Sequence, residues 1–217
     1  MAQAKSVDAI TNGFPYPTLH NHPGKPSYVP IKDTHRILTA NVASIKSPCV
    51  WGQNSHLRLV LTTTQYPLVS QVPFVRLTNP GHTSNILVWI NPFDKKALLR
   101  KHAKQRRKYN KCCNINAALR NHLLMALDDT YLSPLKNAFT GYSIATTLQL
   151  LIHLYAYYAR ILATDLAKNE NNLWEAYNLK EPLSSLYMRL NNCVDYVTVA
   201  GYPITEGQVV CIAYGFV

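Results

Sequence analysis

The sequence predicts a mainly α-helical protein with a short β-prone segment near its N-terminus and a Pro-rich extended arm. Apolar residues recur at helical spacing over most of the chain after residue 92. Five of the 13 prolines fall within residues 1–36, where they disfavour helix. Apolar residues make up 47% of the 217 positions, which is enough for a core. We therefore expect an arm at 1–36, a β-prone or irregular segment at 37–91 and a helical domain at 92–217.

The segment 37–91 owes its β-prone character to three short apolar runs, at residues 57–61, 72–77 and 86–90. A turn signal, Asn79-Pro80-Gly81, stands between the second run and the third. We expect a few short strands here, joined by irregular segments.

The first expected helix is strongly basic. Residues 94–111 hold nine of the chain's 22 Lys and Arg against one acid. With about 100° between successive helical residues, seven of the nine share one arc of roughly 140°. The opposite side carries Leu98, Leu99, His102 and Tyr109, so the pattern predicts a docked helix with one basic face. The seven are Lys96, Arg100, Lys101, Lys104, Arg107, Lys108 and Lys111.

Helical periodicity continues after the basic run. A stripe at 115–127 extends the helical pattern, and a second stripe covers 144–158. A third helix is expected at 166–177, with Thr164 as its N-cap.

Two further helices are marked by their ends. Pro182 occupies the favoured first position of a helix whose apolar stripe covers 183–197, and Gly201 ends it. The tetrapeptide Thr205-Glu206-Gly207-Gln208 has the pattern of a capping box. A last helix is therefore expected to begin there.

Composition argues against export and membrane insertion. The first ten residues, MAQAKSVDAI, lack the apolar core of a signal peptide. The longest apolar stretch, 148–162, is interrupted by Gln149, His153 and Arg160, so we expect no membrane span. The five cysteines form no CxxC pair, which is typical of free thiols in a reducing compartment. We expect a soluble, cytoplasmic protein.

No catalytic or metal-binding pattern stands out. The eight histidines include no HExxH, and the spacing of His102, Cys112, Cys113 and His122 matches no standard zinc site. A Gly-rich phosphate loop is also absent. We therefore expect no metal, no cofactor and no enzymatic activity.

Charge density points to a polyanion as partner. Nine positive charges in so short a segment favour nucleic acid, with an ordinary solvated helix face as the alternative. Tyr109 is the only aromatic residue in the run, so binding is expected to tolerate any sequence. Residues 123–217 carry five bases and eight acids, a net −3. This split favours antiparallel or head-to-tail contacts between copies.

Two stretches of the chain together resemble a known family. Residues 37–81 read ILTANVASIKSPCVWGQNSHLRLVLTTTQYPLVSQVPFVRLTNPG. Residues 92–217 contain RKHAKQRRKYNKCCNINAALRNHLLMALDDTYLSPLKN and then SIATTLQLLIHLYAYYARILATDLAKNE. In order and spacing these segments resemble the Gag capsid region of copia-type LTR retrotransposons, particularly those of algae and other protists.

The resemblance implies a helical capsid-like bundle over 92–217 and a structural role. Such a protein self-associates into a virus-like shell or oligomer in the cytoplasm and packages RNA. The basic face is then expected to bind RNA, and the later helices to supply subunit contacts. A nucleic-acid-binding module that tolerates any sequence and never assembles is the alternative. The residues expected to make the subunit contacts are Leu151, Tyr155, Tyr158, Leu186 and Leu190.

Overall fold

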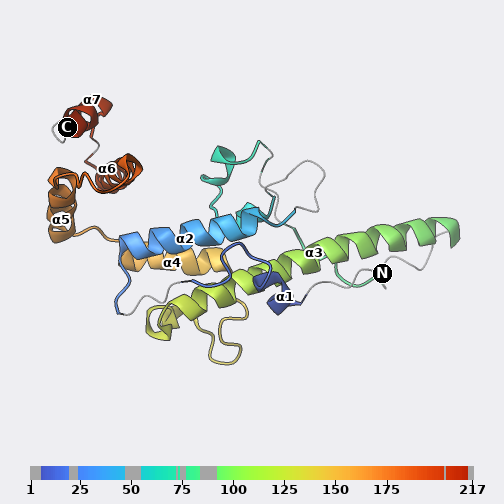
Figure 1. The fold of residues 1–217 in the computed structure, drawn as a ribbon. Helices are drawn as coiled ribbons and strands as arrows, with labels where there is room; N and C mark the ends of the chain where they lie inside the picture. Colours follow the sequence, from blue (N-terminus) through green and yellow to red (C-terminus); the bar gives the residue numbers. More distant parts are fainter. Residues whose placement is uncertain are drawn as a thin grey trace. The chain divides into compact units, whose positions relative to one another are not determined.

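The computed structural model describes residues 6–19, 24–46, 55–71, 73, 77–83, 92–202 and 204–214. This part of the chain is mainly helical and contains no strand, which confirms the mainly α fold class (Figure 1). The chain forms two compact units, Met1–Ala159 and Arg160–Val217.

The prediction of an extended arm over residues 1–36 is partly wrong. A short helix, α1 (Val7–Thr11), begins after Ser6, whose Oγ accepts a hydrogen bond of 3.2 Å from the Ala9 N–H. Helix α2 (Tyr28–Ala43) crosses the expected boundary at residue 36. Pro30 is tolerated because it lies in the first turn, where backbone N–H groups have no partner within the helix.

The strand expected at 57–61 is also wrong. Most of this run belongs to a 3-10 helix, η1 (Ser55–Leu59), which contacts α2, and a second one, η2 (Tyr66–Leu68), follows. Consecutive side chains from His56 to Arg58 are all buried, so the alternation of a strand is absent. The runs at 72–77 and 86–90 lie largely or wholly outside the described residues.

Helices α2, α3 (Pro92–Ala126) and α4 (Thr147–Tyr158) form the body of the first unit, and α1 also contacts α3 (Figure 1). The stripes at 115–127 and 144–158 are confirmed as helical apart from their ends, since Leu127 follows α3 and Ile144 precedes α4. Most of their side chains are buried, but Ile144 is exposed, and Leu148, Tyr155 and Tyr158 are half-buried. Short 3-10 helices η4 (Asp129–Tyr131) and η5 (Ser133–Leu135) lie between α3 and α4. The main core residues are Ile31, Leu38, Val42, Ile115, Leu119, Leu123, Leu150, Leu151 and Leu154.

One polar contact joins α3 to α4 at the core. The Thr147 hydroxyl donates to the Asn116 backbone carbonyl at 3.1 Å, and the Thr147 N–H donates to Asn116 Oδ1 at 3.1 Å. Thr147 is fully buried, so these bonds satisfy polar groups that water does not reach. At the start of α4, Thr146 and Gln149 form a capping box.

The second unit consists of α5 (Ala163–Trp174), α6 (Leu183–Val199) and α7 (Glu206–Tyr214). All three expected helices are confirmed, but Leu162 rather than Thr164 is the N-cap of α5, and Pro182 is the N-cap of α6 rather than its first residue. The chain turns after α6 at Gly201, whose φ of 88° favours glycine. The capping box of α7 forms as expected, with Thr205 N–H donating to Gln208 Oε1 at 2.8 Å. Buried residues of this unit are Leu173, Leu186, Leu190, Cys193 and Ile212.

Candidate nucleic-acid interface

The two halves of α3 have different surroundings. Its C-terminal half packs in the first unit, whereas residues 94–108 extend past α2 and α4 (Figure 1). Among residues 94–108 only His102 is buried. The basic segment is therefore a helix with most of its circumference exposed.

One continuous face runs along both halves. Arg100, Lys104, Arg107 and Lys111 follow one another at spacings of four, three and four, and Ile115, Ala118 and His122 continue the series. Side chains at these spacings lie on the same side of a helix. The face that packs against the body in the C-terminal half is therefore basic in the N-terminal half.

Six of the seven predicted basic residues are available to a ligand. Lys108 is half-buried, and the other five are exposed. Lys111 is different, because its Nζ donates to the backbone carbonyl of Lys46, which follows α2, at 2.9 Å. We call the six residues the basic arc. They are Lys96, Arg100, Lys101, Lys104, Arg107 and Lys108.

Among the described residues, no acidic side chain pairs with the basic arc. Within the described residues, the ion pairs join Arg36 to Asp33, Lys136 to Asp129, and Arg189 to Glu175. None of them involves residues 94–108. The positive charges of the arc therefore stand uncompensated by carboxylates of the described chain.

On the side of α3 opposite the arc, His102 is the buried side chain of residues 94–108. His102 Nε2 lies 3.1 Å from the Gly81 carbonyl oxygen and 3.3 Å from that of Pro80. Carbonyl oxygens only accept, so Nε2 carries the proton. At these residues the Gly81 N–H donates to Asn79 Oδ1 at 3.0 Å, and Gly81 has a φ of 70°, which favours glycine. Leu99, expected on this docked side, is 38% exposed.

A cationic cluster lies where the basic segment meets the body. Arg58 is buried, and its Nη2 lies 3.7 Å from Cys112 Sγ. His56 is 1% exposed, and neither ring nitrogen has a hydrogen-bond partner. Burial lowers the pKa of His56 to about 4, with the charges of Lys111 and Arg58 acting in the same direction. The sequence pattern did not predict this cluster, because Arg58 lies within the expected strand at 57–61 and His56 directly before it.

The residues predicted to join copies require a correction. Leu151, Leu186 and Leu190 are buried in the cores of their own units, because the helical stripes pack within the chain. Tyr155 and Tyr158 are partly buried against the first core. Tyr155 Oη also lies 3.2 Å from His35 Nδ1. The large apolar residues that are exposed on α4 and α6 are instead Ile152, Tyr157, Leu183, Tyr187, Met188 and Val199.

The fold and the site together define a mainly helical protein with an exposed basic helix. Within the described ranges, no group of three or more His, Cys, Asp or Glu side chains is placed to hold a metal, so His102, Cys112, Cys113 and His122 do not form one. None of the helices described is long and apolar enough to cross a membrane. Comparisons with protein families, curated proteins and solved structures found no match.

Proposed function

We propose that this is a structural, capsid-like protein that binds RNA through the basic arc of α3 and self-associates into a shell or oligomer. The observation that carries the proposal is the arc itself. Six Lys and Arg side chains share one face of a projecting helix, and no carboxylate of the described chain pairs with them. Phosphate groups are the counterions that such a face selects.

The chemistry of the arc favours RNA of any sequence. Lys and Arg contact phosphates, which are the same at every nucleotide. Tyr109, the one aromatic residue of the segment, is half-buried and already has contacts within the chain, so it is no platform for base stacking. Binding therefore depends on charge and salt more than on base identity.

Self-association rests on the resemblance to Gag capsid regions, with which a mainly helical fold is compatible. In this proposal the protein works in the cytoplasm as part of a virus-like particle, without catalysis. The basic arc then neutralises packaged RNA, and contacts elsewhere hold the copies together.

Charge reversal on the arc tests RNA binding. The variant carries Arg100→Glu, Lys104→Glu, Arg107→Glu and Lys108→Glu. A matched control with the same change in net charge carries Lys25→Glu, Arg36→Glu, Lys168→Glu and Lys180→Glu, all exposed positions elsewhere. Binding to a fluorescent single-stranded RNA is measured by anisotropy at several salt concentrations.

Six phosphate contacts predict a slope of log K against log salt of about −4 for a single strand. The arc variant is expected to bind at least tenfold more weakly and to lose about three units of slope, because four contacts at about 0.7 each are removed. The control variant is expected to keep most of the RNA affinity and most of the salt slope. Equal losses in the two variants would show that net charge, not the arc, binds RNA.

A second candidate is a nucleic-acid-binding module that does not assemble. It is favoured by the burial of Leu151, Leu186 and Leu190, which removes the subunit contacts first expected. Light scattering on concentrated protein separates the two candidates. Particles or concentration-dependent oligomers, with or without RNA, support assembly. A strict monomer under both conditions leaves only the module.

A further inference from the structure

The second unit carries an open apolar groove between α5, α6 and α7. The groove has a volume of about 830 Å³. Trp174, which lines it, is 59% exposed. Exposed apolar hollows of this size on a small folded unit mark interaction sites. The apolar lining consists mainly of Leu166, Leu173, Trp174, Val197, Ile204 and Ile212.

The first unit presents an apolar projection, Phe139, at the tip of a turn formed by residues 137–141. Phe139 is 97% exposed, the most of any large apolar residue described. Asn137 and Gly141 exchange two backbone hydrogen bonds of 2.9 Å, and Asn137 Oδ1 accepts from the N–H groups of Phe139 and Thr140. An aromatic residue on so constrained a turn loses little conformational freedom on binding.

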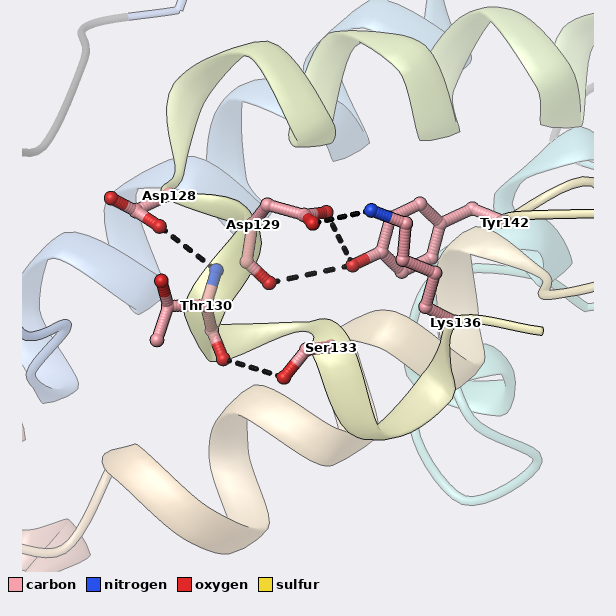
Figure 2. Close-up of polar contacts among 6 residues, drawn as sticks. All are labelled: Asp128, Asp129, Thr130, Ser133, Lys136 and Tyr142. Atoms are coloured by element: carbon pink, nitrogen blue, oxygen red, sulfur yellow. Dashed lines mark hydrogen bonds and ion pairs between the residues drawn. The ribbon is translucent and has the colours of Figure 1, made fainter. Parts of the chain in front are cut away.

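The base of the turn is fixed as well. Figure 2 shows Asp129 contacting residues on both sides of it. Lys136 forms an ion pair with Asp129, and the Tyr142 hydroxyl donates to Asp129 Oδ1 at 2.7 Å. Burial and this bond to Asp129 raise the pKa of Tyr142, so the hydroxyl keeps its proton. The contacts of Asp129 therefore hold the base of the turn in place. Leu68, another highly exposed apolar residue, lies instead on the short 3-10 helix η2.

Charge limits which surfaces of two copies approach each other. Residues 1–159 carry 18 Lys and Arg and five Asp and Glu, a net +13. Residues 160–217 carry four and six, a net −2. Two first units repel each other strongly, whereas a first and a second unit attract. Glu170, at the groove, adds to this attraction.

We propose that the groove of α5, α6 and α7 binds the Phe139 turn of a second copy, so that copies associate head to tail. This rests on the self-association in the proposed function and names the surfaces that produce it. Because the two surfaces differ, a pair joined by one such contact still has one free groove and one free turn. Such contacts extend into open chains or close into rings.

Disulfide trapping tests the contact directly. Cys211 is an exposed thiol that lines the groove. In a background with Cys49→Ser and Cys113→Ser, Phe139→Cys is expected to join Cys211 of the next copy under mild oxidation. Non-reducing gels then show a ladder of dimers and longer species that collapses on reduction. Leu68→Cys in the same background is the control, since residue 68 is also highly exposed, at 84%.

Two results would overturn the proposal. One is a ladder no stronger than that of the Leu68→Cys control. The other is a disulfide that forms within one chain, giving a monomer that has lost two thiols. That product would mean that the groove takes the turn of its own chain.

A mixing experiment tests the head-to-tail geometry without cross-links. Phe139→Ser removes the projection, and Cys211→Glu places a carboxylate in the groove; both positions are exposed, so folding is preserved. Each variant alone is expected to associate at least tenfold more weakly in sedimentation velocity. Their mixture is expected to form dimers and nothing longer, because one intact groove meets one intact turn. A mixture that stays monomeric would contradict the proposal.

Measurements of RNA binding and of oligomeric state distinguish a failure of the head-to-tail contact from a failure of the proposed function. Phe139→Ser and Cys211→Glu should bind RNA as the unchanged chain does, at concentrations below those of association. If the unchanged protein forms oligomers and neither variant weakens them, only the head-to-tail contact fails. If the unchanged protein is monomeric throughout, the proposed self-association fails with it.

Discussion

At the scale of the residue, His56 is the most unusual group described. It is buried, both ring nitrogens lack partners, and Lys111 and Arg58 add positive charge nearby. Its folded-state pKa of about 4 lies below the ordinary value of 6.5, so the unfolded chain binds the proton first. The stability linked to His56 is therefore fully present above about pH 6.5 and is lost as the pH falls towards 4.

We predict that acidification from pH 7.5 to 4.5 lowers the free energy of unfolding and that His56→Leu removes much of this loss. The difference in pKa corresponds to about 3 kcal/mol at its full extent. The pKa values of His35 and His122 are also lowered by burial, so part of the pH dependence remains in the variant. Urea unfolding followed by circular dichroism at several pH values measures the effect.

His82→Leu is the control, because His82 is exposed. It should leave the pH dependence unchanged. The same dependence in His56→Leu as in the unchanged chain would assign the acid sensitivity to other groups.

At the scale of the element, the basic half of α3 is a helix under electrostatic strain. Arg100 and Lys104, Lys104 and Lys108, and Arg107 and Lys111 are like-charged pairs four residues apart. Each such pair destabilises a helix by roughly 0.2–0.5 kcal/mol. Good helix formers such as Ala103 offset this cost. Neutralising the arc with a polyanion relieves the repulsion, so binding should also stiffen the helix.

We predict that Ala103→Pro weakens RNA binding without changing the charge of the arc. Proline removes a helical hydrogen bond and clashes with the preceding turn, at a cost of about 3 kcal/mol. Residues 94–108 bury little, so the unfolding midpoint of the first unit should change far less than the RNA affinity. Anisotropy and thermal unfolding measure the two effects. Ala103→Gly should be intermediate, and unchanged affinity in Ala103→Pro would show that helical geometry is not required.

How far the sequence predicted the structure also varies by element. After residue 92 the period of apolar residues located the helices well, because each helix buries one stripe. The prediction failed at 28–43, because the prolines of residues 1–36 are evidence against a helix. Helix α2 tolerates Pro30 because this residue lies in its first turn. The prediction failed again for Leu186 and Leu190, since an apolar stripe shows that a face is covered but not whether its cover is the same chain or another copy.

At the scale of the whole molecule, the two units differ in the size of the apolar core that stabilises each of them. The first has a core drawn from α2, α3, α4 and η1, whereas the buried apolar cluster of the second is much smaller. A unit as small as the second buries a smaller fraction of its surface and is correspondingly less stable. Its exposed groove adds to this weakness.

We predict that the second unit unfolds at a lower urea concentration than the first. Trp51→Phe and Trp89→Phe leave Trp174 as the only tryptophan, and its fluorescence then reports on the second unit alone. Its transition should precede the main loss of helix seen by circular dichroism. Coincident transitions for the two probes would mean that the units unfold together.

Helix α3 runs without interruption from the core of the first unit into the basic segment. The amide hydrogens of its two halves should therefore exchange with solvent at very different rates. Amide hydrogens at 115–126 exchange with solvent only when the unit opens, because Ile115, Leu119 and Leu123 anchor this stretch in its core. Amide hydrogens at 94–108 exchange whenever the N-terminal turns fray. A polyanion bound to the basic arc should slow exchange at 94–108 and leave exchange at 115–126 unchanged. Binding is then seen as slower exchange along only one half of a single helix.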